Sequence, residues 1–249
     1  MSGGPLAGRV VLVTRPAEQA EDLADRLRAL GAEPLIAPTI RLAPPEAGGD
    51  LDAAIRGVAA GRYAWIVFTS AAGVTGWSQR AAAVAADAVP ARLAAVGRTT
   101  AEAVRTAIRE PDLIPPVFTT AALAEAFPTG RGAVLLPRAD LATDELEEAL
   151  RRKGWSPVRV DAYRVSLVES IPAGARRALE EERVDAITFT SPSTVEGFVT
   201  LAGMPRRPSI VCIGPVTAEA ARGAGFDVAA VADPHTTEGL VSALVRAFG

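Results

Sequence analysis

The sequence is poor in the side chains that most often carry metal or nucleophilic chemistry. Its 249 residues include one cysteine, Cys212, and one histidine, His235. A disulfide within the chain and a thiolate or histidine cluster for a metal ion are therefore excluded. A Ser-His-Asp triad could form only through His235, which lies in the loop-like stretch DPHTTEG. Cys212 lies in the apolar run SIVCIG, where we expect a small core residue of a strand.

Charge and hydrophobic runs remove further classes of protein. Lys153 is the single lysine, and its neighbours in RRKGW indicate a solvated helix end rather than a Schiff-base site. The net charge of -3 does not indicate nucleic-acid binding, which usually requires a basic face. No apolar run approaches the about 18 residues of a membrane span, and MSGGPLAGR lacks the pattern of a signal peptide. We therefore expect a cytoplasmic protein with neither nucleic acid nor a membrane as partner.

Most of the chain consists of an internal repeat, in which three sequence blocks occur twice in the same order. One such match would be weak evidence, whereas three in register indicate a duplicated unit. The matched pairs are residues 10–38 with 133–162, 63–77 with 184–198, and 93–105 with 210–222.

Each block has the pattern of a strand, a polar turn and an amphipathic helix. Short apolar runs such as VVLVT and AITFT predict strands that are buried on both faces. Gly31 and Gly154 are expected to end two matched helices, and Ser191 followed by Pro192 is expected to begin another. Alternating strands and helices predict an α/β fold of two similar small domains with parallel sheets. The apolar face of the first helix is predicted to comprise Ala20, Leu23, Ala24, Leu27 and Leu30.

Two segments do not follow this pattern. Residues 34–45 and 156–168 read as extended, and they occupy comparable places after the matched helices. We therefore expect them to connect the two domains.

Five motifs, in their order along the chain, resemble the uroporphyrinogen-III synthase family. They are VTRP, FTS followed by a helix, AYRV, IGPVTAEA, and the T-x-GL of residues 237–240. Each motif is short, but together they cover essentially the whole chain. The resemblance implies two flavodoxin-like lobes joined by a two-stranded bridge. The implied lobes are residues 1–37 plus 167–249 and residues 42–162, with bridging segments 36–42 and 161–167.

The reaction that the resemblance implies is closure of the linear hydroxymethylbilane into uroporphyrinogen III. Water is lost and the last pyrrole ring is inverted, and no metal or organic cofactor is required. The expected partner is a linear tetrapyrrole with eight carboxylates, held in a cleft between the lobes. We further expect a monomer, with transient contact to the preceding pathway enzyme left open.

Hydroxyl and guanidinium groups in the strand-to-helix turns are the candidate ligands for these carboxylates. In a parallel sheet such turns share the edge at which ligands bind, and helix N-termini favour anions. Any single Ser or Thr there is as well explained as a helix cap, and each arginine as a structural salt bridge. The candidates are Thr14, Arg15, Thr69, Ser70, Thr100, Arg138, Ser191, Ser193, Thr217, Thr236 and Thr237.

Tyr163, one of two tyrosines, is the candidate catalytic residue. The resemblance places it in the bridge, near the substrate, where its phenol could help the departing hydroxyl group leave. The alternative is a strand tyrosine that only packs on its neighbours. No dominant acid–base pair is evident, so positioning of the substrate would supply most of the rate.

Two other functions remain to be weighed. Two lobes joined by connecting strands also describe small-ligand binding and sensor proteins without catalysis, which would form only the type I isomer background from bilane. A nucleotide or phosphosugar enzyme is disfavoured, because neither G-x-G-x-x-G after a strand nor G-x-x-x-x-G-K-[ST] occurs.

Overall fold

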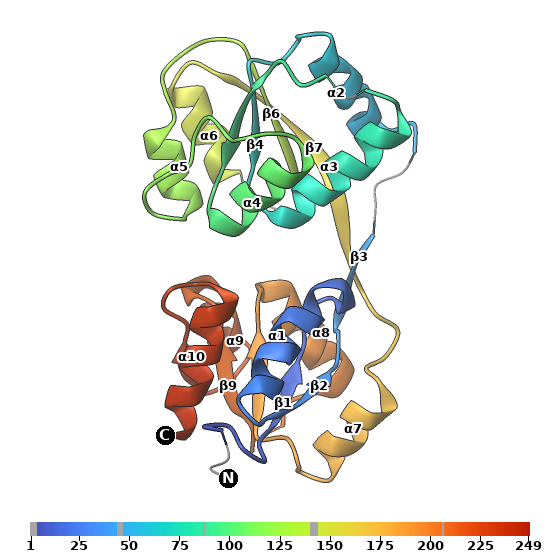
Figure 1. Ribbon diagram of the computed structural model, residues 1–249, viewed down its shortest axis with the longest axis vertical. Helices are drawn as coiled ribbons and strands as arrows, with labels where there is room; N and C mark the ends of the chain where they lie inside the picture. The colour runs from blue at the N-terminus through green and yellow to red at the C-terminus, as the bar shows by residue number, and fades with distance from the viewer. Residues whose placement is uncertain (1–3, 44–46, 87, 140–143, 206) are drawn as a thin grey trace. The chain divides into compact units, whose positions relative to one another are not determined.

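The computed structural model describes residues 4–43, 47–86, 88–139, 144–205 and 207–249. Strands and helices alternate along this part of the chain (Figure 1). The strands are β1 Val10–Val13, β2 Glu33–Ile36, β3 Ile40–Ala43, β4 Trp65–Phe68, β5 Arg92–Ala95, β6 Ala133–Ala139, β7 Ser156–Leu167, β8 Ala186–Phe189, β9 Ser209–Cys212 and β10 Val228–Val231. The helices are α1 Ala17–Ala29, α2 Asp50–Ala59, α3 Ala71–Ala83, α4 Arg98–Ala107, α5 Thr120–Ala126, α6 Glu145–Arg152, α7 Ala173–Glu180, α8 Pro192–Ala202, α9 Pro215–Gly223 and α10 Thr237–Phe248.

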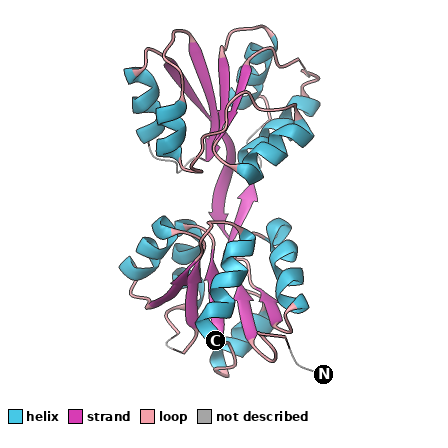
Figure 2. Cartoon of the chain, turned by 60° about the vertical axis from the view of Figure 1, so that its left-hand side comes forward, coloured by secondary structure: helices cyan, strands magenta, loops and turns pink. Residues whose placement is uncertain are grey.

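The chain forms two compact units, each built around a five-stranded sheet. Unit 1 comprises Met1–Arg41 with Ser166–Gly249, and unit 2 comprises Leu42–Val165. The strand orders are β10-β9-β8-β1-β2 in unit 1 and β3-β7-β6-β4-β5 in unit 2. The predicted two-domain α/β fold is therefore confirmed, and Figure 2 shows the sheet of each unit lying between helices.

Both connections between the units run as strands. β3 and β7 are neighbours in the second sheet, and each crosses a division between the units. Within unit 1, the Arg41 Nε donates to the Ser166 Oγ at 3.0 Å, and the Val168 N–H donates to the Thr39 carbonyl at 3.3 Å. The predicted extended segments are confirmed over their described residues; positions 44 and 45 lie outside them.

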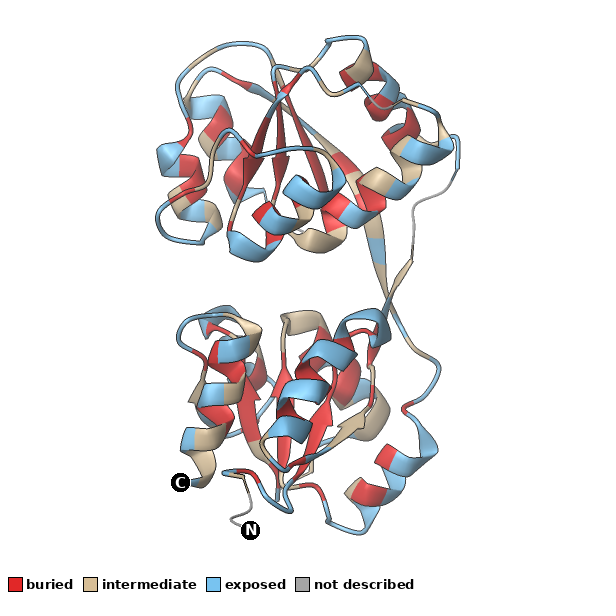
Figure 3. Cartoon of the chain, viewed as in Figure 1, coloured by how far each residue is buried: buried red, intermediate tan, exposed pale blue. Residues whose placement is uncertain are grey.

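In unit 1 the sheet is covered on both faces, so its strands are apolar on both sides. Val11 and Val13 of β1 face a cluster formed with α1 and α10. Val10 and Leu12, which alternate with them, face a second cluster formed with α7, α8 and α9. Figure 3 shows the resulting pattern of buried strands and helices that are buried on one side only.

In unit 2, as in unit 1, the sheet lies between two layers of helices. The side chains of Trp65 and Val67 pack with α5 and α6, whereas those of Ile66 and Phe68 pack with α2, α3 and α4. Helices equivalent by their place in the chain thus cover equivalent faces: α6 corresponds to α1, and α3 to α8.

The strand pairings establish the duplication residue by residue. Val10 pairs with Glu33 between β1 and β2, and Ala133 pairs with Ser156 between β6 and β7. The two ladders therefore match at a constant offset of 123 residues over four successive pairs. The same offset relates Arg15 to Arg138.

The predicted ends of the helices are confirmed. Gly31 and Gly154 follow α1 and α6 with φ of 88° and 91°, a left-handed conformation that glycine adopts without strain. Ser191 caps α8 and Pro192 occupies its first position. On α1, four of the predicted apolar side chains are buried and Leu30 packs partly buried beside them.

Lys153 is partly exposed and follows the exposed Arg151 and Arg152 at the end of α6, as predicted. Its Nζ donates to the carbonyl oxygens of Glu125 and Phe127, both at 2.6 Å. The ammonium group thus ties the end of α6 to the end of α5, because the last carbonyls of a helix lack partners within the helix.

Cys212 lies in the core of unit 1, as predicted, and burial raises the pKa of its thiol to about 12. His235 lies in the loop before α10. No described helix combines the length and apolar character needed to cross a membrane.

Gly76 fixes the distance between α3 and β7. A Cβ at this position would overlap the carbonyl oxygen of Ala162 in β7. The equivalent Gly197 in α8 lies in the same way against the carbonyl oxygen of Thr39, at 2.9 Å from the site of a Cβ. Each glycine therefore lets a helix lie directly on the backbone beside the bridge.

We expect Gly76→Ala to lower the free energy of unfolding by about 1–3 kcal/mol, since the added methyl group must displace helix or strand. Urea unfolding measures the loss. Gly174→Ala is the control, because a Cβ at this helical position meets no atom within 4 Å. Equal stability of the two variants would show that α3 does not need this close approach.

Candidate functional site

Most candidate residues of each unit follow strands of its sheet and lie at or near the starts of helices, whereas Arg138 lies near the end of β6 and Tyr163 lies within β7. The strands β10, β9, β8, β1 and β2 pair in parallel, as do β7, β6, β4 and β5, so the carboxyl ends of these strands share one edge in each unit. The unit 2 candidates are Thr69, Ser70, Thr100, Arg138 and Tyr163. The unit 1 candidates are Thr14, Arg15, Ser191, Ser193, Thr217, Thr236 and Thr237.

In unit 2 the structure brings Ser70 and Tyr163 together. The Ser70 hydroxyl lies 3.2 Å from the Tyr163 hydroxyl, and either group can donate. Ser70 also caps α3, since its Oγ accepts from the Gly73 N–H at 3.1 Å. Both side chains are half-buried, so this pair of hydroxyls keeps contact with solvent.

A bulge and a close helix contact place Tyr163 there. Arg138 pairs with Asp161, but the next residue, Ala139, pairs with Tyr163, so Ala162 is an extra residue in β7. Bulges of this kind redirect the side chains beside them. The Ala162 carbonyl is also the group that lies against the helical glycine of α3. Nothing in the sequence pattern signals either feature.

The helices α4 and α9, which directly follow β5 and β9, begin at a glycine and therefore have no side-chain acceptor for their first N–H groups. Gly97 precedes α4 in unit 2 and Gly214 precedes α9 in unit 1, and neither helix has a side-chain cap. Thr100 and Thr217 are the third residues of these helices, and both are buried. Such open N-termini carry partial positive charge and favour anions.

Phe118 and Arg98 are residues that sequence reasoning missed. Phe118 is 44% exposed and lies against Gly97. The Arg98 guanidinium lies over its ring, 5.6 Å from the centroid. An exposed aromatic ring and a cation therefore adjoin the open start of α4, yet a single phenylalanine in a turn gives no recognisable pattern in the sequence.

The hydroxyl groups of unit 1 are mostly engaged in capping. Ser191 and Thr194 form a capping box at the start of α8, and the Ser193 Oγ lies 2.9 Å from the Ser191 Oγ. The Thr236 Oγ1 caps α10 by accepting from the Gly239 N–H at 3.1 Å. Ser191 and Thr236 therefore act as helix caps, as the alternative interpretation predicts. The Ser193 hydroxyl can still form a further hydrogen bond.

Thr14 and Thr69 differ in access. Thr14 is fully buried, and its hydroxyl donates to the Thr188 carbonyl at 2.7 Å. That bond joins β1 to β8 and makes Thr14 a structural residue, so we do not retain it as a ligand. Thr69 is half-buried at the end of β4, beside Ser70.

The two equivalent arginines have different surroundings. Arg138 is 5% exposed, and its Nη1 donates to both carboxylate oxygens of Glu147, at 3.0 and 2.8 Å. Arg15 is 8% exposed and has no described carboxylate within 4.0 Å. Burial lowers the pKa of its guanidinium, an effect that the charge of Asp22 partly offsets. We therefore interpret Arg138 as structural, and sequence reasoning missed its partner Glu147.

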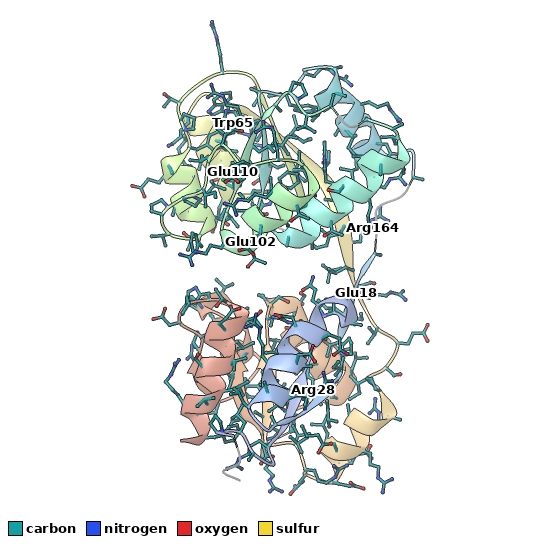
Figure 4. All side chains as sticks on the ribbon, viewed as in Figure 1. Glu18, Arg28, Trp65, Glu102, Glu110 and Arg164 are labelled. Carbon is teal, nitrogen blue, oxygen red and sulfur yellow. The ribbon has the colours of Figure 1, made fainter. Side chains whose placement is uncertain are left out.

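The acidic side chains of α1 form ion pairs mainly with arginines of the same helix. Glu18 and Arg28 lie towards opposite ends of the helix (Figure 4). Arg28 pairs with Asp25 at 2.6 Å, and Asp22 pairs with Arg26 at 3.1 Å. The acidic groups of this helix are thus largely engaged with its own arginines.

Other possible binding features lie apart from these residues. A hollow between α5 and α6, lined by Thr120, Glu145 and Lys153 among others, contains none of the predicted site residues. Within the described ranges, no group of three or more His, Cys, Asp or Glu side chains could hold a metal ion.

Comparison with known proteins gives consistent matches. A family model described as uroporphyrinogen-III synthase HemD matches residues 21–242. The uroporphyrinogen-III synthase of Synechococcus elongatus is 32% identical, with 98% of this chain and 97% of that protein covered. The structure of a mutant uroporphyrinogen III synthase from Thermus thermophilus is similar with a TM-score of 0.65 at 22% identity, covering 96% of this chain and 98% of that one. The uroporphyrinogen-III synthetase of Helicobacter pylori gives a TM-score of 0.62 at 15% identity, covering 96% and 99%. The two structural matches concern the fold.

We expect Glu147→Gln to lower the free energy of unfolding by about 3–5 kcal/mol, because it leaves the Arg138 charge buried without its carboxylate. The neighbouring Glu148→Gln is the matched control. Glu148 is exposed and its contact with Arg152 is 4.0 Å long, so its loss should cost less than about 1 kcal/mol. If denaturant unfolding finds the two variants equally stable, the buried pair does not hold α6 on the sheet.

Proposed function

This chain belongs to the uroporphyrinogen-III synthase family, and on that premise we propose that it closes hydroxymethylbilane with the help of a hydroxyl chain formed by Ser70 and Tyr163. The family's enzymes are cyclising lyases of tetrapyrrole biosynthesis, and the substrate is a small tetrapyrrole. The interpretation as a sensor without catalysis is not favoured.

The observation that carries the mechanism is the order of donors and acceptors at the start of α3. The Gly73 N–H donates to the Ser70 oxygen, so the Ser70 hydroxyl proton is available for the Tyr163 oxygen. When Ser70 donates, Tyr163 keeps its own proton for a further acceptor. Hydrogen bonds in such a chain polarise one another, and the positive end of α3 adds to the effect.

We propose that this acceptor is the hydroxyl group of the bilane. As the bond between carbon and oxygen breaks, the electron pair leaves with the oxygen, which takes the Tyr163 proton and departs as water. The resulting cation on the terminal pyrrole is attacked by the substituted carbon of the last ring. The bond joining that carbon to its original methylene bridge then breaks, which leaves a cation on the third pyrrole, and the free α-carbon of the last ring attacks this cation. The proton that this α-carbon loses, as aromaticity returns, restores the phenol.

Binding of the carboxylates completes the proposal. The open starts of α4 and α9 provide N–H donors in each unit, and Thr69, Thr100, Ser193 and Thr217 lie beside them or at neighbouring turns. Charge-assisted hydrogen bonds contribute about 1.5–3 kcal/mol each, so several would hold a polycarboxylate despite the net charge of -3. Orientation of the terminal rings can then supply about 7–11 kcal/mol without a strong base.

Three further expectations remain part of the proposal. The functional lobes would be residues 1–37 plus 167–249 and residues 42–162, bridged by segments 36–42 and 161–167. The protein would act as a cytoplasmic monomer. Contact with the preceding pathway enzyme would be transient, and sedimentation of the two proteins together would detect any stable complex.

We expect Tyr163→Phe to lower kcat by about 100-fold, the lower end of the range for a positioned proton donor, with little change in KM. Isomer analysis of the porphyrin formed from hydroxymethylbilane measures the effect. Tyr63→Phe is the matched control, because Tyr63 is the second tyrosine and packs against the apolar cluster of unit 2.

Two outcomes would contradict the proposal in different ways. A wild-type protein that yields only the type I isomer would refute the assigned reaction. A fully active Tyr163→Phe variant would leave the reaction standing but show that Tyr163 only packs in its strand.

A further inference from the structure

Arg15 lies at a position where the other half of the molecule has a neutralising carboxylate. At the offset of 123 residues, Arg15 corresponds to Arg138, and Glu147 corresponds to Ala24. The equivalence is supported along the helix, since Leu23 corresponds to the equally buried Leu146. Unit 1 therefore retains the buried arginine but has a fully buried methyl group in place of its counter-ion.

The hydrogen bonds of Arg15 do not replace that counter-ion. Its Nη1 makes two long bonds, at 3.3 Å to the Gln19 carbonyl and at 3.4 Å to the Thr237 Oγ1. Its Nε is buried without a partner in the described structure. Its Nη2 donates to no described residue and, unlike Nε, is not among the fully buried unpaired atoms. Part of the guanidinium fork thus has no partner among the described residues.

The surrounding field increases the need for an anion. Thr237 is the first residue of α10, a helix of 12 residues, so the guanidinium lies beside the positive end of that helix. Glu238 in the same turn is paired with Arg26 at 2.8 Å. A buried cation beside a second source of positive charge is unfavourable unless an anion offsets it. Asp22, the acidic residue whose charge acts on Arg15, is bound to Arg26.

We propose that Arg15 and the start of α10 form a binding site for a single carboxylate, and that Glu147 occupies the corresponding site in unit 2 permanently. The ligand class rests on the proposed function, under which the carboxylate is one of those on the bilane. The planar fork of Arg15 suits the two oxygens of a carboxylate. The duplication has thus left one binding position for the substrate and converted the other into a structural ion pair.

The direct test transfers the counter-ion. Ala24→Glu places a carboxylate at the position of Glu147, and Ala24→Gln has nearly the same volume without the charge. We expect KM for hydroxymethylbilane to be about 10-fold or more higher in Ala24→Glu than in Ala24→Gln, the change that loss of one charge-assisted contact produces. Equal KM values in two folded variants would overturn the proposal.

A second pair of variants covers the case in which these substitutions do not fold. Arg15→Met removes a cation that binds no described carboxylate. Arg138→Met instead removes the cation that binds the buried carboxylate of Glu147. We expect Arg15→Met to keep its melting temperature while KM rises by about 10-fold or more, and Arg138→Met to lose stability. A large drop in melting temperature of Arg15→Met with unchanged KM would show a structural arginine.

Citrate binding separates this inference from the assigned reaction. At constant ionic strength, citrate but not chloride should raise the melting temperature of the wild type to saturation, and Arg15→Met should reduce the shift. An equal shift in both proteins, or none in the wild type, would contradict the site. If the wild type formed no type III isomer while the Arg15-dependent citrate shift remained, the reaction would be refuted and the anion site retained.

Discussion

Burial of parallel strands on both faces is the constraint on which the rest of the structure depends. A strand such as β1 can contribute only apolar side chains along its length, because α1 and α10 cover one face and α8 covers the other. Most candidate polar groups therefore lie where strands end and helices begin. Arg138 and Tyr163 lie inside strands instead, and Tyr163 follows the bulge in β7 and meets Ser70 at the start of α3.

The fold was largely accessible from the sequence because its signals are local and repeated. Apolar runs of four or five residues located the strands, and Gly31 with Gly154 marked the same helix end in both halves. The exchange of the first block between the two domains came from the family resemblance alone, because the spacing of the repeats does not show whether each repeat folds by itself. The helix end at Lys153 was predicted, but its bonds to backbone carbonyls 26 and 28 residues away were not, because no pattern around the lysine reveals them.

The candidate site was less predictable because its contacts are long-range. Ser70 and Tyr163 are 93 residues apart, and they meet through a bulge and a glycine contact that leave no periodic signature. Thr14 shows the opposite failure, since a turn hydroxyl predicted to be available for a ligand is bound to the carbonyl of the neighbouring strand. The sequence already contains the difference between Arg15 and Arg138, because the residue equivalent to Glu147 is Ala24. Only the strand register, however, shows that positions 24 and 147 are equivalent.

The buried thiol of Cys212 has a practical consequence for spectroscopy. Because its pKa is raised to about 12, almost no thiolate exists near neutral pH, and maleimide or methanethiosulfonate reagents have nothing to attack in the folded protein. The native chain should therefore not react with cysteine-directed labels while it is folded. Spin labels or fluorophores introduced on the outer helices of each unit would report distances and their fluctuations without first removing a native side chain.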